Sequence, residues 1–433
     1  MMEFIFTKTP LAYFVASFWR DEAFSYLMAK LPLHTLLWST AQDANPPLYY
    51  VLLKLWMGIF GSSEVAIRSL SLVFFWATIY VLYLLLKEVL KLSERKSIAY
   101  LALFIINPLL HYYAFEARMY SLMAFLATLL FYTFLKKQYR LYAYTALFAV
   151  FTHYFLFVVI AFQVLYSLIL LPKSERKHLL LPLGKAALWF IPWILLLFFA
   201  RPPVGQSFWI LTSRLKDILL LPAIIFTGYE KTAWVTYGYL PHLSFSIISI
   251  GLIAAYFRAF HQKKRLSVLL FGWGLVIPLV IFIISFWKPV FLPRYLIFTT
   301  IGLITFLILC IEGIKNKYVR VGIIALLIFF SLSYATVQVI LRTKAPLKEL
   351  FSRAKQQMLD TDVVYVTHEY DFHPAQYYFP TRKVYVYKKT YEELPWFVGK
   401  VLIDKESFRT TLPIYPERAV IVSGKSFSIQ SSR

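Results

Sequence analysis

The sequence contains little charge, few acidic residues and almost no cysteine. Its one cysteine, Cys310, excludes an internal disulfide and a cysteine-based metal cluster. Only 15% of the 433 residues are charged, whereas 60% are hydrophobic. A soluble protein of this length cannot bury so much apolar surface. The composition therefore predicts an integral membrane protein.

Acidic side chains are scarce beside basic ones. The chain has 22 Asp and Glu against 45 Lys and Arg, which gives a formal net charge of +23. Such an excess can indicate nucleic-acid binding. In a membrane protein, however, Lys and Arg gather in the cytoplasmic loops. We therefore expect the lipid bilayer, and no nucleic acid, as a partner.

Long apolar runs recur along the chain, and about 20 such residues suffice to cross a bilayer. Ten candidate spans follow from them: Ala66–Leu86, Ile98–Phe115, Met119–Leu135, Leu141–Thr152, Phe155–Leu171, Leu179–Ala200, Phe245–Phe257, Leu266–Trp287, Tyr295–Ile311 and Val321–Leu341. The shorter run Pro10–Trp19 precedes them as a thin or tilted helix, a re-entrant piece or part of a longer segment. The sequence predicts a polytopic α-helical membrane protein with about 10–11 transmembrane helices.

Basic residues concentrate in alternate loops, and this pattern predicts the topology. The basic loops contain Lys87 and Lys91, Lys136 and Lys137, Lys173 and Lys177, Lys263 and Lys264, and Lys315 and Lys317. The positive-inside rule places them in the cytoplasm. The stretch 141–171 has basic residues on both flanks, so two short helices that turn near His153 fit better than one. His153 then lies on the outer side.

The remaining segments are expected outside the membrane core. Glu22–Leu37 and Pro46–Phe60 have the spacing of helices that lie in the outer interface, and loop 201–243 is expected to cover it. The polar C-terminal part predicts a helix at Ala345–Met358 and strands at Val363–Thr367, Val384–Tyr387 and Ala419–Val422. Residues 1–341 thus form the membrane domain, and residues 342–433 a small extracytoplasmic α/β domain.

Carboxylates cluster beside the predicted membrane boundary. Asp21 and Glu22 follow Trp19, and charged groups near a bilayer often mark a reaction or a pathway. They also suit the first turn of a helix. Asp43 is explained equally well as part of a turn before a proline pair. Two carboxylates in one loop need a cation or a substrate between them.

Polar residues also lie at three other predicted outer turns. Glu116 and Arg118 stand among tyrosines, as a structural ion pair or as part of a sugar-binding site. His153 is either an interfacial histidine or a catalytic or metal-binding one. Arg294 is either an interface anchor or a guanidinium that binds a lipid phosphate, supported by Lys288 and Arg201.

Several motifs occur in order between residues 18 and 171. They are Trp19-Arg20-Asp21-Glu22-Ala23-Phe24-Ser25, Asp43-x-Asn45-Pro46-Pro47-Leu48-Tyr49-Tyr50, Gly61-x-x-Glu64-x-x-x-Arg68-x-x-Ser71, Tyr113-x-x-Glu116-Ala117-Arg118-Met119-Tyr120-Ser121 and Thr152-His153-Tyr154. Together they resemble the GT-C membrane glycosyltransferases. More narrowly, they resemble the branch of protein mannosyltransferases and bacterial aminoarabinose and Rgt-type transferases. Beyond residue 171 the resemblance rests on topology and on Pro293-Arg294-Tyr295.

This resemblance implies a reaction. A polyprenyl-phosphate-linked sugar would be the donor, and a hydroxyl of a protein, glycan or lipid the acceptor, with inversion at the sugar. The active site would face outward from the cell (inner) membrane. The resemblance implies catalysis by Asp21 with Glu22 beside it, acceptor or cation binding by Asp43, Glu116 and His153, and donor sugar or phosphate binding by Arg118, Arg294, Tyr113, Tyr120, Lys288 and Arg201.

The sequence departs from the family in two respects. The segment before Asp21 is short for a full helix, and Glu116-Ala117-Arg118 lacks the paired carboxylates of some branches. A divalent cation, Mg or Mn, held by Asp43, Glu116 and His153 is therefore an open expectation. A transporter of lipid-linked sugars and an inactive scaffold are the alternative functions. Transporters more often contain internal repeats and mid-membrane charges.

Overall fold

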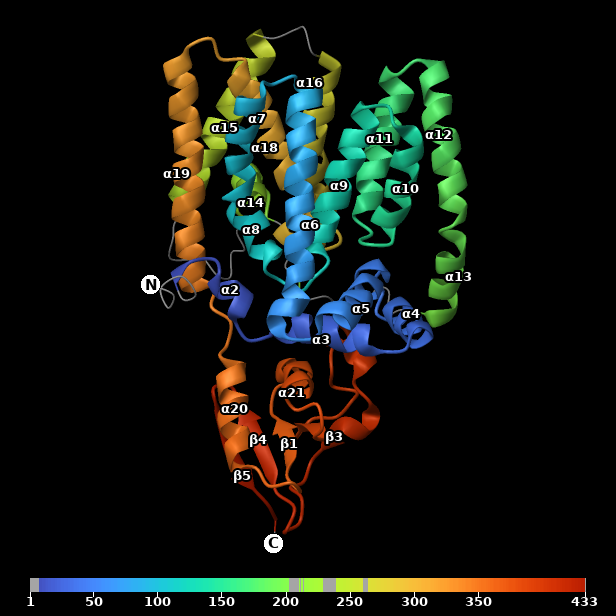
Figure 1. Cartoon of the computed structure of the whole chain (residues 1–433), viewed down its shortest axis with the longest axis vertical. Coiled ribbons are helices and arrows are strands. Elements are labelled where there is room, and N and C mark those ends of the chain that lie inside the picture. Colours follow the sequence, from blue (N-terminus) through green and yellow to red (C-terminus); the bar gives the residue numbers. More distant parts are fainter. Residues whose placement is uncertain are drawn as a thin grey trace.

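A helical bundle stands on a smaller α/β domain, and short helices lie between the two (Figure 1). This computed structural model describes residues 8–201, 210, 212, 214–228, 239–259 and 264–432. Parts of the predicted cover at 201–243, and Lys263, lie outside the described residues.

The bundle contains helices that are long and apolar enough to cross a membrane. Its α-helices are α6 (Glu64–Leu84), α7 (Glu94–Ile105), α8 (Pro108–Ala114), α9 (Tyr120–Leu135), α10 (Tyr139–Val150), α11 (Leu156–Leu170), α12 (Lys173–Leu188), α13 (Ile191–Ala200), α14 (Leu221–Thr227), α15 (Tyr239–Ala259), α16 (Lys264–Phe271), α17 (Ile277–Ile284), α18 (Ile297–Glu312) and α19 (Lys317–Leu341). In the described part, five continuous segments qualify as spans, and up to seven qualify if two bent pairs are included. The chain is a multi-pass membrane protein, as its composition predicted.

One predicted span is broken rather than straight. Ile98–Phe115 divides into α7 and α8, whose axes differ by 74°. Asn107 caps α8, because its side-chain oxygen accepts hydrogen bonds from the backbone N–H groups of Leu109 and Leu110 at 3.1 Å. Pro108 occupies the first position of α8, where its missing N–H costs nothing. The Asn-Pro pair therefore ends α7 and starts a new helix.

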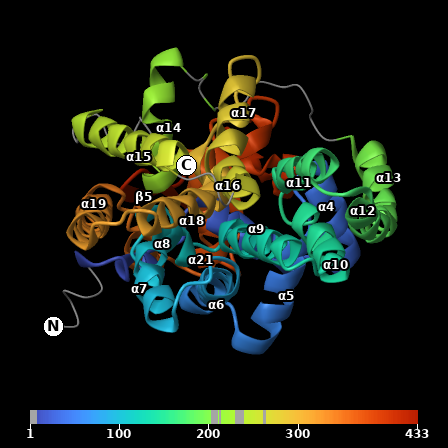
Figure 2. The ribbon, with the colours of Figure 1, turned by 90° about the horizontal axis from the view of Figure 1, so that it is seen from above.

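The stretch 141–171 forms two helices, which confirms the prediction from its basic flanks. α10 ends at Val150 and α11 begins at Leu156, with His153 in the turn. The backbone N–H of Leu48 donates to the carbonyl of Phe151 at 3.0 Å. This bond joins the turn to the short helices beneath the bundle. Figure 2 shows α10 to α13 grouped on one side of α9, with α14, α15 and α19 on the other.

Within the described residues, four short helices precede the bundle and lie across its lower end (Figure 1). They are α2 (Ala12–Val15), α3 (Arg20–Lys30), α4 (Leu33–Gln42) and α5 (Leu48–Phe60). The prediction of one helix at Glu22–Leu37 is wrong, because Pro32 separates α3 from α4. Within residues 8–19 the structure contains α2 and no spanning helix.

The C-terminal domain packs α20 (Leu347–Gln357) and α21 (Phe372–Tyr378) against a five-stranded sheet. Its strands are β1 (Val363–Val366), β2 (Val384–Tyr387), β3 (Phe408–Arg409), β4 (Ala419–Ser423) and β5 (Ser426–Gln430). The order is β3-β2-β1-β4-β5, and only the β4–β5 pair is antiparallel. The three predicted strands are confirmed as β1, β2 and β4. Prediction missed the two edge strands, since β3 has two residues and β5 is polar along one face.

Hydrogen bonds fix the C-terminal domain beneath α3. The Tyr378 hydroxyl accepts from the backbone N–H of Phe18 at 3.0 Å and donates to Glu64 at 3.1 Å. The rings of His373 and Phe24 pack edge to face, with centroids 5.7 Å apart. The domain is therefore positioned to contribute to any site around α3.

Candidate active site

Asp21 and Glu22 are neighbours in the first turn of α3, but their surroundings differ completely. Successive residues of a helix point about 100° apart. Asp21 lines a cavity, and its side chain is 15% exposed. Glu22 has no exposure and does not line that cavity. The sequence predicted both as catalytic, whereas the structure brings only Asp21 to the cavity.

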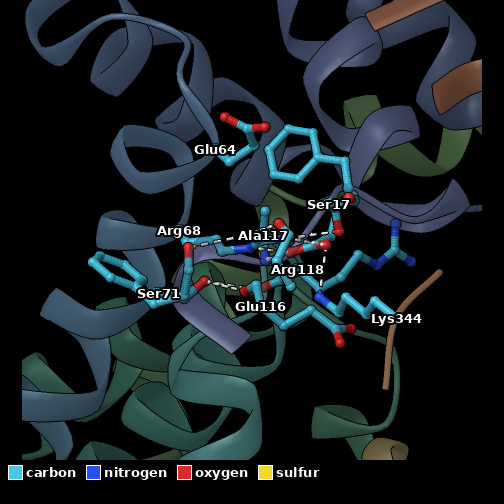
Figure 3. A network of polar contacts seen from close by, with 12 residues as sticks. Ser17, Glu64, Arg68, Ser71, Glu116, Ala117, Arg118 and Lys344 are labelled. Atoms are coloured by element: carbon cyan, nitrogen blue, oxygen red, sulfur yellow. Dashed lines mark hydrogen bonds and ion pairs between the residues drawn. The ribbon is translucent and has the colours of Figure 1, made fainter. Parts of the chain in front are cut away.

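Glu22 is the centre of a buried ionic network, and its partners Arg68, Ala117 and Lys344 are labelled in Figure 3. Arg68 of α6 donates from Nε to Oε1 and from Nη2 to Oε2, both at 2.7 Å. Lys344 donates to Oε2 at 2.7 Å, and the backbone N–H of Ala117 donates to Oε1 at 3.0 Å. Burial opposes ionisation, but Arg68 and Lys344 outweigh it and hold the pKa of Glu22 low. Both oxygens are thus occupied by protein donors.

Arg68 also holds the short segment that precedes Asp21. Its Nη1 donates to the carbonyls of Phe14 and Ala16 at 3.0 Å and 2.6 Å, and Nη2 donates to that of Ser17 at 3.2 Å. One buried guanidinium therefore binds the backbone of residues 14–17 and the carboxylate of Glu22 together. This contact, rather than a full spanning helix within residues 8–19, fixes the loop that presents Asp21.

The cavity beside Asp21 has a volume of about 230 Å³. It is lined by Arg20, Asp21, Phe24, Asp43, Ala44, Asn45, Pro46, Arg118, Tyr120, His153, Tyr154, Phe155, Arg294, Tyr295, Trp396, Phe397, Val398 and Gly399. These residues come from α3, the turns after α4, α8 and α10, the start of α9, the turn Pro293–Leu296 before α18, and the C-terminal domain. Six predicted site residues meet here: Asp21, Asp43, Arg118, Tyr120, His153 and Arg294.

Arginines surround Asp21. The Nε atom of Arg20 lies 3.0 Å from its carboxylate, and the guanidinium of Arg20 lies over the ring of Tyr370 at 4.7 Å. Burial raises the pKa of Asp21, but the positive charges of Arg20, Arg118 and Arg294 outweigh burial and hold the pKa below its usual value. Asp21 is therefore ionised at neutral pH.

The pKa of Asp43 is raised, whereas the pKa of Asp21 is lowered. Asp43 ends α4 and accepts a hydrogen bond from the side-chain amide of Asn45. Burial, with a smaller contribution from the negative charge of Asp21, raises its pKa to about 7 despite that hydrogen bond and the charge of Arg118. The next residue, Ala44, has φ of +56°, a conformation that non-glycine residues rarely adopt. The cavity thus holds one ionised carboxylate and one that titrates near neutrality.

His153 is a neutral hydrogen-bonding group in this cavity. Its Nδ1 accepts from the backbone N–H of Phe155 at 3.2 Å, so the ring proton resides on Nε2. Burial, helped by the charge of Arg118, lowers the pKa of His153 to about 3. Its ring packs against those of Tyr295 and Phe155, with centroids 5.3 Å and 5.4 Å away. The Nε2–H group of His153 is therefore a hydrogen-bond donor, and aromatic rings surround it.

Four further predicted residues lie outside the cavity. Tyr113 packs behind Tyr120, with ring centroids 4.7 Å apart. Glu116 is 1% exposed, and neither carboxylate oxygen has a hydrogen-bond partner among the described residues. Burial raises the pKa of Glu116. Lys288 and Arg201 are exposed and are not among the lining residues.

The predicted cation-binding set is not assembled. Asp43 and His153 line the cavity, but Glu116 does not. Within the described ranges, no three His, Cys, Asp or Glu side chains form a group that fits a metal ion. Arg118 and Arg20 are the cations whose charges act on both Asp21 and Asp43.

The C-terminal domain also contributes to the cavity, which the sequence did not predict. Trp396–Val398 and Gly399 close one side of the cavity. Gly399 has φ of +79°, and a Cβ atom there would lie 2.6 Å from Phe24 and 2.7 Å from His373. Only glycine permits this close approach. The sequence feature that could have indicated this contribution is the aromatic pair Trp396-Phe397, which stands shortly before Gly399 in a mainly polar domain.

The fold has relatives among solved structures. No protein-family model and no curated protein sequence matches the chain. ArnT from Cupriavidus metallidurans in the apo state matches with a TM-score of 0.62 and 12% identity, over 95% of this chain and 90% of that one. The same protein bound to undecaprenyl phosphate matches with a TM-score of 0.58 and 12% identity, over 95% and 91%. The chain therefore has the polytopic helical fold, with a C-terminal domain, of the solved ArnT structures, which confirms at the level of the fold the resemblance found in its sequence.

Proposed function

We propose that the protein is an integral-membrane glycosyltransferase that moves a sugar from a polyprenyl-phosphate carrier to an acceptor hydroxyl. The observation that carries this proposal is the cavity in which Asp21 and Asp43 face Arg20, Arg118 and Arg294. Such a site offers a proton acceptor beside a cluster of cations. The fold of a protein that was solved with bound undecaprenyl phosphate supports a lipid phosphate as the ligand of those cations.

The proposed reaction is a single displacement. The acceptor oxygen forms a bond to the anomeric carbon while the bond from that carbon to the phosphate oxygen breaks. Asp21 takes the acceptor proton, and the polyprenyl phosphate leaves with the electron pair. Attack from the face opposite the phosphate inverts the anomeric configuration.

Five further cavity residues have a proposed role in that step. Arg294 and Arg118 bind the donor phosphate and stabilise the charge that grows on it as the bond breaks. Tyr120 and the Nε2–H of His153 contact the sugar. When Asp43 is ionised, its charge strengthens the proton affinity of Asp21, because like charges nearby disfavour a second anion.

The acceptor is proposed to enter between the C-terminal domain and the short helices that lie above it in Figure 1. Trp396 and Phe397 line the cavity from that side, so an acceptor must pass them to reach Asp21. The described basic loops of the bundle lie at its far end, away from this domain (Figure 1). With those loops in the cytoplasm, the cavity and the C-terminal domain face the extracytoplasmic side of the cell (inner) membrane.

The test uses the purified full chain in proteoliposomes with labelled polyprenyl-phosphate sugars. Binding and covalent transfer are measured separately for the wild type, for Asp21→Asn and for Asp360→Asn, a matched change at an exposed carboxylate. We expect Asp21→Asn to retain donor binding and lose about 10²- to 10⁴-fold in transfer rate. Transfer by Asp21→Asn at the wild-type rate rejects Asp21 as the base. Movement of intact donor across the bilayer without transfer identifies a transporter, and failure to bind any donor rejects the proposed function.

A further inference from the structure

A second cavity lies between α10 and α12, away from the candidate active site. Its volume is about 1360 Å³. It is lined by Lys137, Tyr139, Arg140, Ala143, Tyr144, Leu147, Ser174, Glu175, Lys177, His178, Leu181, Pro182, Lys185, Ala186 and Trp189. On each helix most of these residues recur every three or four positions, the spacing of one helix face. The cavity is therefore a groove along α10 and α12. These two helices lie at the edge of the bundle (Figure 2).

One end of the groove is strongly basic. Lys137, Arg140, Lys177 and His178 lie there with a single acid, Glu175. The carboxylate of Glu175 is already engaged, because Tyr139 donates to it at 2.6 Å and Lys137 lies 3.0 Å away. Arg140 and Lys177 are exposed, and neither forms an ion pair with any described residue. At this end, therefore, no described acidic side chain neutralises the positive charges of Arg140 and Lys177.

Lys185 adds a cation deeper in the groove. It lies 12 residues after Lys173, which begins α12, a distance of roughly 18 Å along the helix axis. Leu181 and Leu188 nearby are exposed, as expected of a surface that faces lipid. A charge at this depth is costly and needs a partner, yet no described carboxylate pairs with Lys185. Lys185 lines the groove, so its ammonium group is available to an anion bound there.

The inner end of the groove is apolar. Leu147, Leu181, Ala186 and Trp189 form its walls, and Trp189 is 74% exposed. From Lys177 to Trp189 the groove extends over 12 residues of α12, again roughly 18 Å. One leaflet contributes about 15 Å of hydrocarbon. The groove therefore changes from cationic to apolar over the length of one lipid chain.

We propose that this groove binds one anionic glycerophospholipid from the leaflet at the basic end of the bundle. Its phosphate lies among Arg140, Lys177 and Lys185, and an acyl chain runs past Leu181 to Trp189. A zwitterionic lipid would place its own cation among these three. The proposal goes beyond the proposed sugar transfer, and it stands or fails independently of it.

The test measures lipid retention by the full chain with native mass spectrometry from detergent micelles. The probes are dioleoyl phosphatidylglycerol and dioleoyl phosphatidylcholine, which have the same acyl chains. Arg140→Gln/Lys185→Gln is compared with Arg95→Gln/Lys315→Gln, which removes two exposed cations at the same end of the bundle but outside the groove. We expect the groove variant to bind phosphatidylglycerol about tenfold more weakly or worse, and the control to change about twofold or less.

A second variant distinguishes a specific lipid-binding site from general electrostatic attraction between the protein and anionic lipid. Leu181→Trp keeps every charge and fills the groove, so it should also lose phosphatidylglycerol retention. This variant decides the matter if the double change in the groove prevents folding. Equal losses in both double variants, equal retention of the two lipids by the wild type, or full retention by Leu181→Trp would each overturn the proposal.

Discussion

The carboxylate of Glu22 and the guanidinium of Arg68 form a paired, two-bond contact, and neither side chain has any exposure to solvent. Glu22 belongs to the helix that carries Asp21, and Arg68 belongs to the first long helix of the bundle. The contact therefore joins the candidate base to the membrane domain. Lys344, which follows the last bundle helix, completes the network.

Glu22→Gln should destabilise the fold. The change leaves the buried charge of Arg68 uncompensated, which costs about 3–5 kcal/mol. Denaturant or thermal unfolding of the purified protein measures the effect. Glu349→Gln, at an exposed position of α20, is the matched control and should leave stability within about 0.5 kcal/mol. Equal stability of the two variants would contradict a structural role for the Glu22–Arg68 pair.

Asp43→Asn should alter the pH dependence of transfer. The pKa of Asp43 is raised to about 7, so the group is protonated below that pH and becomes an anion above it. The wild-type rate should rise through about pH 7 as this charge strengthens Asp21 as a base. The rise should be absent in the variant, whose amide does not titrate. An unchanged inflection in Asp43→Asn would assign it to another group.

Arg294→Ala should weaken donor binding. Removal of a buried cation from a bound phosphate costs about 2–5 kcal/mol, or about 30-fold or more in Kd. Titration with a labelled polyprenyl phosphate measures it. Lys288→Ala and Arg201→Ala are sharp controls, because the sequence predicted both as phosphate ligands whereas the structure leaves them exposed outside the cavity. Comparable losses in all three variants would contradict the assigned phosphate site.

Trp396→Ala should act on the acceptor rather than on the donor. Loss of one aromatic face is worth about 0.5–1.5 kcal/mol, so the acceptor KM should rise about two- to tenfold while the donor Kd stays constant. Steady-state kinetics at saturating donor separate the two. Trp38→Ala, on the exposed side of α4, serves as the control. A selective loss of donor binding would place Trp396 on the donor side instead.

Cysteine labelling should place the two ends of the bundle on opposite sides of the membrane. In a Cys310→Ser background, Lys30→Cys and Lys315→Cys introduce thiols at two exposed lysines, one beside the cavity helices and one in a basic loop. An impermeant maleimide added outside intact cells should label only the first. Labelling of both from one side would contradict the proposed orientation.

Local patterns predicted much of the architecture, and their failures have local causes. The basic flanks of 141–171 predicted the turn at His153, because charged loops mark the ends of spans whatever the rest of the chain does. The break at Asn107-Pro108 was not predicted, because the residues on both sides are apolar and a hydropathy profile shows one continuous run. The edge strands were missed because they are short or polar on one face.

The gathering of the cavity residues was predicted only in part. Asp21, Asp43, Arg118 and His153 were expected together because topology places their loops at one end of the bundle. Trp396 was not expected, since it reaches the cavity through the docking of the C-terminal domain on α3 and α4. Lys288 and Arg201 show the converse error, because a loop at the correct end of the bundle does not fix where a side chain points.

The sequence by itself determined a multi-pass membrane protein with polar turns at one end, because lipid solvation depends on local composition. The resemblance favoured Asp21 as the base with Glu22 beside it, but the sequence did not show how differently the two adjacent carboxylates are surrounded. The tertiary structure decided this difference, since Glu22 takes its partners from residues 46, 95 and 322 positions away. Those donors turn Glu22 into the buried core and leave Asp21 to face the cavity.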